Sequence, residues 1–288
     1  MSDTRLGGTF QLGSRRVHRM GFGAMQLAGP GVFGPPRDRP ATLAVLREAI
    51  ALGIDHIDTS DFYGPHLVNE AIGEALAPYP ESLVLVTKLG ARRDGSGAWL
   101  EWNSPEALEQ GLRDNLEHLG LPAMEVVNLR LFTGHGGPRE GSVRPFLEPL
   151  IRLKDQGLIE HIGISTATRT QVAEARGMTE IVCVQNHYNL AHREDDALID
   201  ELAAADIAYV PYFPLGGFNP LQSDALSSVA AGLGITPMQT ALAWLLRRAP
   251  NILLIPGTSS LGHLRENVAA ADIDLPDRAL AQLDAIGA

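Results

Sequence analysis

The segment Gly53-Ile54-Asp55-His56-Ile57-Asp58-Thr59-Ser60-Asp61-Phe62-Tyr63-Gly64 changes character halfway along. Its first half reads as a short strand, with Ile54 and Ile57 as the apolar positions. Its second half is polar and ends in the turn Gly64-Pro65. Because rigid strands position the loops that follow them, a polar cluster directly after an apolar strand is typical of a binding or catalytic site.

On both sides of this segment, short apolar strands alternate with helical patterns. The expected strands cover residues 20–25, 54–58, 83–88, 124–130, 161–165, 181–185, 207–212 and 252–257. The expected helices cover residues 41–53, 69–76, 105–119, 145–156, 169–176, 195–205, 237–248 and 261–270. Strands that alternate with helices of this length pair in parallel, and eight such units close into a barrel.

The sequence therefore predicts an α/β fold, a (β/α)8 TIM barrel, as a single domain over residues 1–288 with a short β-hairpin near residues 9–20. The alternative is an open, doubly wound sheet. Its glycine-rich fingerprint G-x-G-x-x-G begins at Gly21 and Gly23 but is not completed, which favours the barrel.

Charge and cysteine content narrow the class of protein. The chain has 23 Lys and Arg against 34 Asp and Glu, a net charge of −11, so we expect neither a nucleic-acid nor a membrane partner. The single cysteine, Cys183, lies in an apolar strand and is interpreted as a small buried side chain. The amino terminus lacks an apolar targeting segment. We expect a cytoplasmic protein, as a monomer or a small homo-oligomer.

In a barrel, the residues that carry chemistry stand at the carboxyl ends of the strands. Asp58, Tyr63 and Lys88 are the first candidates, because an ammonium and a carboxylate beside a phenol lower the cost of moving its proton. A lone Asp or Lys could equally be a surface charge. Tyr212, at a later strand end, could be a stacking platform or an ordinary packed aromatic.

The last strand runs into Gly257-Thr258-Ser259, where backbone N–H groups at a helix start could hold a phosphate or merely cap the helix. The histidines at 18, 56, 118 and 263 lack metal-ligand spacing, and we expect no metal site. His135 is interpreted as a solvated loop residue.

Several of these blocks together resemble the signatures of the aldo-keto reductases. They are Asp58-Thr59-Ser60-Asp61-Phe62-Tyr63-Gly64, Val86-Thr87-Lys88, Gln185-Asn186, Pro214-Leu215-Gly216 and Ile255-Pro256-Gly257-Thr258. They cover nearly the whole chain in the family's order. The resemblance implies NADPH-dependent reduction of a small-molecule aldehyde to an alcohol, with pyridoxal to pyridoxine as the expected reaction.

The resemblance also implies roles for particular residues. Tyr63 would be the general acid, Lys88 paired with Asp58 would lower the pKa of the phenol, and Arg130 stands where the family usually has histidine and would orient the substrate oxygen. The residues expected to bind the cofactor are Gly23, Ala24, Met25, Asp58, Ser165, Gln185, Tyr212, Leu215, Gly257, Thr258, Ser259, His263 and Asn267.

Two features bear on cofactor binding. Thr166 follows Ser165 where the family usually has asparagine, which leaves the contact with the carboxamide of the cofactor open. His263 and Arg265 are the basic groups expected near the 2′-phosphate. The alternatives are a reductase of another aldehyde or ketone, a barrel aldolase that uses Lys88 as a Schiff base, and a non-catalytic NADPH-binding regulator.

Overall fold

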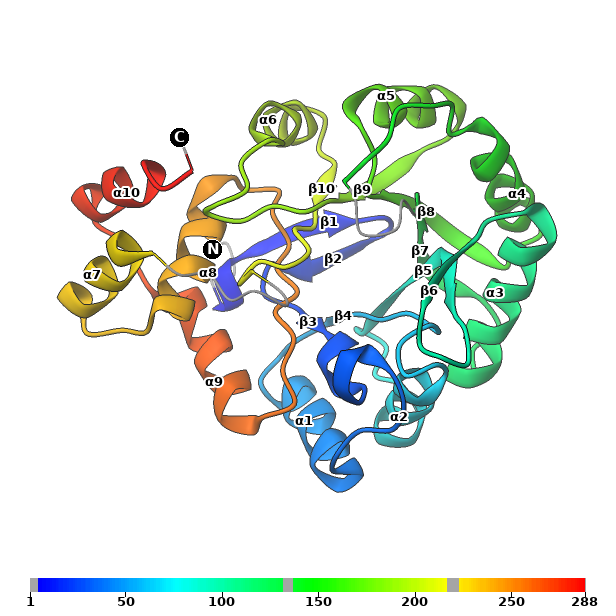
Figure 1. Cartoon of the computed structure of the whole chain (residues 1–288), viewed down its shortest axis with the longest axis horizontal. Helices are drawn as coiled ribbons and strands as arrows, with labels where there is room; N and C mark the ends of the chain where they lie inside the picture. Colours follow the sequence, from blue (N-terminus) through cyan, green and yellow to red (C-terminus); the bar gives the residue numbers. More distant parts are fainter. Residues whose placement is uncertain (1–4, 132–136, 217–222, 288) are drawn as a thin grey trace.

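The parallel strands of the computed structural model pair in chain order around a barrel, with helices outside them (Figure 1). The structure describes residues 5–131, 137–216 and 223–287. Neighbouring strands in order are β3 (Phe22–Gly23), β4 (His56–Asp58), β5 (Val84–Arg93), β7 (Met124–Arg130), β8 (Ile159–Ser165), β9 (Ile181–Gln185) and β10 (Ala208–Tyr209). Single parallel bridges from Ile252 to Tyr209 and from Leu254 to Met20 join the two edges. The barrel prediction is confirmed, although the eighth strand consists of these bridges alone.

A hairpin covers one end of the barrel. β1 (Thr9–Leu12) and β2 (Arg15–His18) pair antiparallel, as the sequence predicts. Leu12 and Val17 pack into an apolar cluster with Val84 and Val182, which lie near the starts of their strands. The hairpin therefore closes the amino ends of the strands, and access to the barrel lies at the carboxyl ends.

Most helices begin where the sequence places a cap. Eight helices follow the strands: α1 (Arg39–Ala51), α2 (Leu67–Leu76), α3 (Pro105–Leu119), α4 (Arg144–Asp155), α5 (Arg169–Met178), α6 (Asp196–Ala204), α8 (Pro237–Arg248) and α9 (Leu261–Ala269). Ser104 caps α3 by accepting a hydrogen bond from Ala107 N, and Gly120 ends it in the left-handed conformation. Two further helices, α7 (Asp224–Leu233) and α10 (Asp277–Asp284), lie outside the helices predicted from the sequence.

Two segments near the barrel mouth differ from expectation. β5 continues past Lys88 to Arg93 and pairs antiparallel with β6 (Trp99–Trp102), which was expected to be loop. The turn between them is held by Asp94 Oδ1, which accepts hydrogen bonds from the backbone N–H groups of Ser96 and Ala98. The first barrel strand also ends early, because Ala24 and Met25 begin a 3-10 helix, η2 (Ala24–Leu27).

Within the described residues, no single helix is long and apolar enough to cross a bilayer. Among these residues, α7 and α8 are long and apolar enough only when they are taken as one pair, and the pair is bent by 93° where the two helices join. Every residue of α8 from Thr240 to Leu245 is buried.

Candidate active site

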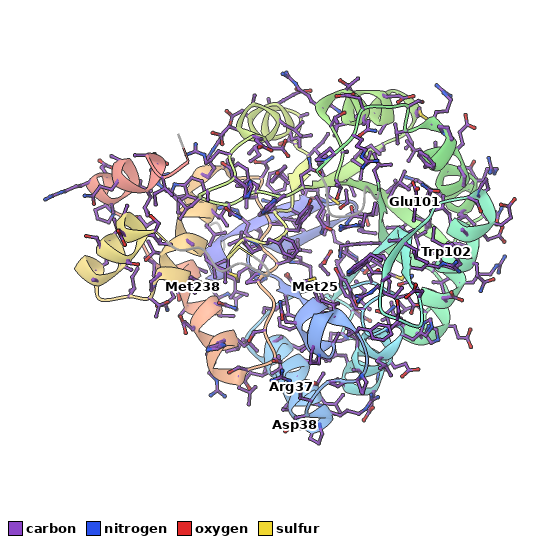
Figure 2. All side chains as sticks on the ribbon, in the orientation of Figure 1. Met25, Arg37, Asp38, Glu101, Trp102 and Met238 are labelled. Carbon is purple, nitrogen blue, oxygen red and sulfur yellow. The ribbon has the colours of Figure 1, made fainter. Side chains whose placement is uncertain are left out.

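A cavity of about 830 Å³ opens at the carboxyl ends of the barrel strands. Asp58, Arg130 and Gln185 are the last residues of β4, β7 and β9, and all three line it. The cavity also brings together the following residues predicted from the sequence: Gly23, Met25, Tyr63, Lys88, Tyr212, Leu215 and Gly257. Met25 lies near the middle of the barrel in Figure 2, whereas Trp102 lies on the α3 side.

Asp58 and Lys88 form a buried ion pair at the floor of this cavity. Lys88 Nζ lies 2.5 Å from Asp58 Oδ1 and also donates to the backbone oxygen of Thr59 at 3.0 Å. Gln185 Nε2 donates to the other oxygen of Asp58 at 2.8 Å. Burial opposes the charge on Lys88, but Asp58 and Tyr63 outweigh it, and the pKa of Lys88 is raised. A Schiff-base lysine needs a lowered pKa, so this environment argues against the aldolase alternative.

Tyr63 is buried beside this pair, with the Lys88 ammonium 5.2 Å from the centre of its ring. Burial raises the pKa of Tyr63, Lys88 and Arg130 lower it, and Asp58 adds to the rise. The net direction is upward, opposite to the one expected from the sequence. Only 5% of Tyr63 is exposed, and a phenolate in that environment loses its hydration. Tyr63 therefore keeps its proton near neutral pH, the state that a general acid requires.

Arg130 reaches the cavity from the end of β7. Its guanidinium lies 5.8 Å from the centre of the Tyr212 ring. Its Nε is buried and has no hydrogen-bond partner among the described residues. Gly90 permits this position, because a Cβ there would lie 2.2 Å from the backbone oxygen of Arg130. A permanent cation thus lines the same cavity as Tyr63.

The residues around the cavity fit the nicotinamide end of a dinucleotide. A Cβ at Gly23 would lie 2.4 Å from the backbone oxygen of Ile255, and one at Gly257 would lie 2.5 Å from that of Gly23. These glycines keep the backbone close at the barrel seam. Gln185 Oε1 is buried without a partner in the described part of the chain, so it can accept from a carboxamide. The half-buried ring of Tyr212 offers a flat stacking face.

Of the predicted phosphate residues, Gly257 lines the cavity, whereas Thr258 and Ser259 on the adjoining turn and Asn267 on α9 lie outside its lining. Thr258 Oγ1 accepts from Ser260 N at 3.0 Å, and Ser260 Oγ caps the helix. Ser259 and His263 are exposed, and Asn267 is buried. Arg265, expected near the 2′-phosphate, is bound to Glu48 at 2.8 Å.

Two other predicted site residues, Ala24 and Ser165, are not among the residues that line the cavity. Both residues are buried. Ser165 Oγ lies 3.5 Å from Thr166 Oγ1, and Thr166 has a φ of 59°, in the left-handed region. His135 lies outside the described residues.

Sequence reasoning missed two histidines that line the cavity. The ring of His187 stacks on Tyr212, with centres 5.5 Å apart, and His192 lies 4.0 Å from His187. His187 directly follows Gln185-Asn186 after β9, a position that could have been recognised. Phe62 contacts Tyr63 and Trp99 edge-on. Trp99 could be expected to wall or cover a pocket from its place in the segment after Lys88, and the β5–β6 hairpin places it in the cavity lining.

These features together define a reductase-type barrel. The chain belongs to the aldo/keto reductase family, because the sequence model of that family matches residues 19–288. Among known proteins, pyridoxine 4-dehydrogenase of Escherichia coli is 62% identical over 279 residues, covering 96% of this chain and 98% of that protein. An uncharacterised oxidoreductase of Schizosaccharomyces pombe is 35% identical over 99% of this chain and 92% of its own length.

Solved structures agree with this family. A thermostable aldo-keto reductase in complex with the inhibitor epalrestat is 26% identical with a TM-score of 0.81, over 97% of this chain and 99% of that one. An aldo/keto reductase from Klebsiella pneumoniae in complex with NADP and acetate is 25% identical with a TM-score of 0.78, over 96% and 94% of the two chains.

Proposed function

We propose that this protein reduces pyridoxal to pyridoxine with NADPH. The observation that carries the proposal is the buried Asp58–Lys88 pair beside a protonated Tyr63 at the mouth of the barrel. The 62% identity to a pyridoxine 4-dehydrogenase and the NADP complex of the Klebsiella structure support the substrate and the cofactor.

The cofactor would lie along the barrel seam. Gln185 and Tyr212 would hold and stack its nicotinamide, beside the close backbone contact that Gly23 and Gly257 permit. Thr258, Ser259, His263 and Asn267 would face its phosphate end. NADPH supplies the hydride when bound, and the protein supplies orientation and a proton.

Tyr63 would donate its phenolic proton to the carbonyl oxygen as negative charge develops there. The ammonium of Lys88 would stabilise the phenolate that remains, and Asp58 keeps that ammonium charged and in place. Ordered Lys88 and Asp58 side chains need no rearrangement when the proton moves. The burial that raises the pKa of Tyr63 also keeps bulk water from supplying the proton instead.

Arg130 would recognise what distinguishes pyridoxal from a simple aldehyde. Pyridoxal carries a hydroxyl group next to its aldehyde, so two oxygens lie side by side. The planar guanidinium offers several N–H donors in a fixed fork, whereas a histidine offers one or two single donors. An arginine at this position therefore suits an ortho-hydroxy aldehyde.

The test is NADPH oxidation, followed by its absorbance, with pyridoxal and with simple aromatic aldehydes. We expect turnover that favours pyridoxal and is lost in Tyr63→Phe. NADPH binding, measured by fluorescence, checks that this variant still holds the cofactor. Cofactor binding without turnover of any carbonyl would contradict the proposal and favour the regulator.

A cytoplasmic location, a single domain and a monomer or small homo-oligomer belong to the same proposal.

A further inference from the structure

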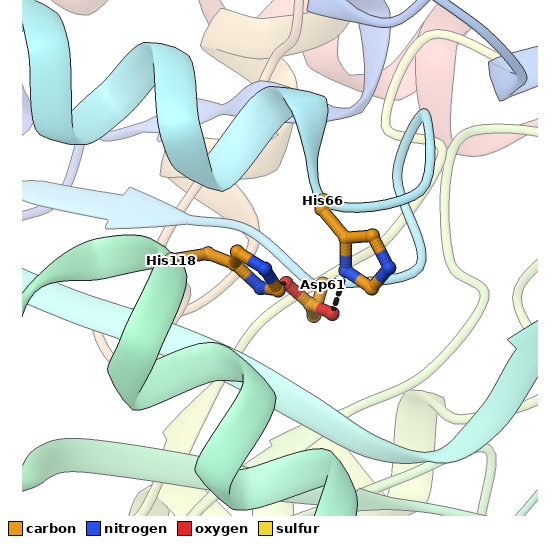
Figure 3. Close-up of side chains that lie close together, drawn as sticks. All are labelled: Asp61, His66 and His118. Atoms are coloured by element: carbon orange, nitrogen blue, oxygen red, sulfur yellow. Dashed lines mark hydrogen bonds and ion pairs between the residues drawn. The ribbon is translucent and has the colours of Figure 1, made fainter.

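Three side chains outside the active-site cavity, those of Asp61, His66 and His118, point toward one another (Figure 3). Asp61 comes from the loop after β4, His66 directly precedes α2, and His118 lies in the last turn of α3. His66 Nδ1 lies 2.6 Å from Asp61 Oδ2, and His118 Nδ1 lies 2.9 Å from Asp61 Oδ1. Across the described part of the chain, this is the one group of three or more His, Cys, Asp or Glu side chains whose ligand atoms all lie within 4.8 Å of one another.

Asp61 is oriented by a buried network of amides and hydroxyls. Asn69 Nδ2 donates to Asp61 Oδ1 at 3.3 Å and to Asn115 Oδ1 at 2.9 Å. Thr59 Oγ1 donates to Asn69 Oδ1 at 2.8 Å. Thr59, Asn69 and Asn115 are all at most 1% exposed, so they fix the carboxylate. Partners of this kind, which hydrogen-bond a ligating side chain, orient it for a metal ion.

The cluster also has space and access. A second cavity, of about 190 Å³, is lined by Asp61 and His66, and the side chain of His118, which does not line it, is 21% exposed. The side chain of His66 is 46% exposed, so an ion and its water can reach the group from solvent. A tetrahedral ion with ligand bonds of about 2.0–2.1 Å separates its ligand atoms by roughly 3.3 Å. A small rotation of the exposed His66 ring would open the present 2.6 Å distance to that value.

We propose that Asp61, His66 and His118 bind one Zn²⁺ ion, with water at the remaining position. Two imidazole nitrogens and one carboxylate suit Zn²⁺, whereas Ca²⁺ and Mg²⁺ prefer all-oxygen sites. This site departs from the expectation of no metal, which considered His118 only by its spacing in the sequence.

The ion would cross-link the Tyr63 loop to α3. Asp61 is two residues before Tyr63, and its backbone oxygen accepts from His66 N at 2.8 Å. Zn²⁺ would take no part in the reduction. It would stabilise the folded chain by mass action, because the three ligands are assembled only in that state.

The experiment is calorimetric titration of ZnCl₂ into the full chain, carrying no histidine tag, after chelator treatment and dialysis. We expect one equivalent to bind and the melting temperature to rise. His66→Gln and His118→Gln should each weaken binding at least about tenfold. Co²⁺ in place of Zn²⁺ should give the intense visible bands of a four-coordinate site, and these should be lost in both variants.

His18→Gln is the matched control. It removes a histidine from another Asp–His pair, in which His18 Nδ1 lies 2.7 Å from Asp55 Oδ2, and it should bind Zn²⁺ like the wild type. Since His66 is exposed, its variant tests the site even where His118→Gln folds poorly. Absence of Zn²⁺ binding to the wild type below about millimolar concentration, or equal binding by His66→Gln, would overturn the proposal.

Discussion

Lys88 Nζ and Asp58 Oδ1 lie 2.5 Å apart, with 3% of Lys88 and 4% of Asp58 exposed. An ion pair this deeply buried contributes little net stability as a pair, because both charges have lost their water. Removing only one partner lowers stability, because the other charge then stays buried without a counter-ion.

Lys88→Met should therefore lower the free energy of unfolding by about 3–5 kcal/mol, because the carboxylate of Asp58 stays buried without a cation. Urea denaturation measures this. The double variant Asp58→Asn with Lys88→Met removes both charges and should recover part of the loss while remaining inactive. A double variant less stable than Lys88→Met would contradict the argument.

Tyr63→Phe should lower kcat with pyridoxal by about 10²–10⁴, the usual contribution of a positioned general acid. The affinity for NADPH should be unchanged, because only the hydroxyl group is lost. Steady-state kinetics and fluorescence titration measure the two quantities separately. Turnover within a factor of a few of the wild type would exclude Tyr63 as the proton donor.

Arg130→Lys should erase a preference for ortho-hydroxy aldehydes. The wild type should favour salicylaldehyde over benzaldehyde in kcat/KM, and the variant should lose about tenfold of that ratio, as expected for one charged hydrogen bond. Because lysine keeps the positive charge, the comparison measures the effect of the planar set of N–H donors that only arginine has. An unchanged ratio of the two kcat/KM values would show that Arg130 does not bind the hydroxyl oxygen next to the aldehyde.

Thr166→Asn should stabilise the fold by about 1 kcal/mol. Thr166 has a φ of 59°, and a β-branched residue is strained there, whereas asparagine adopts that region more readily. Thermal unfolding measures the gain. The control is Thr168→Asn, at a helix N-cap with a φ of −72°, where no strain is relieved and no gain is expected.

Stability should fall as the pH drops from about 6.5 towards 4 because of His187. Burial first, and then His192, lowers the pKa of His187 to about 4, against about 6.5 in the unfolded chain. Between these values the unfolded chain binds more protons, so stability rises with pH and is fully present above about 6.5. Urea midpoints at several pH values measure the slope, and His187→Gln should flatten it. An equal slope in that variant would assign the effect to other groups.

The sequence by itself determined the alternation of strands and helices and the order of the polar strand ends. Both are local signals: apolar periodicity and the caps at Ser104 and Gly120 act within a few residues of one another. Because parallel strands in a barrel end at the same rim, Asp58, Lys88 and Gln185 could be expected to meet before any contact was known.

Only the tertiary structure decided what depends on residues far apart in the chain. The approach of Gly23 to Gly257 at the seam, the meeting of His66 with His118, and the burial that raises the pKa of Tyr63 belong to this group. No local propensity encodes them, because they follow from how whole elements pack. The sequence placed a lysine near the phenol, but the loss of hydration around Tyr63, which outweighs that charge, exists only once the barrel is closed.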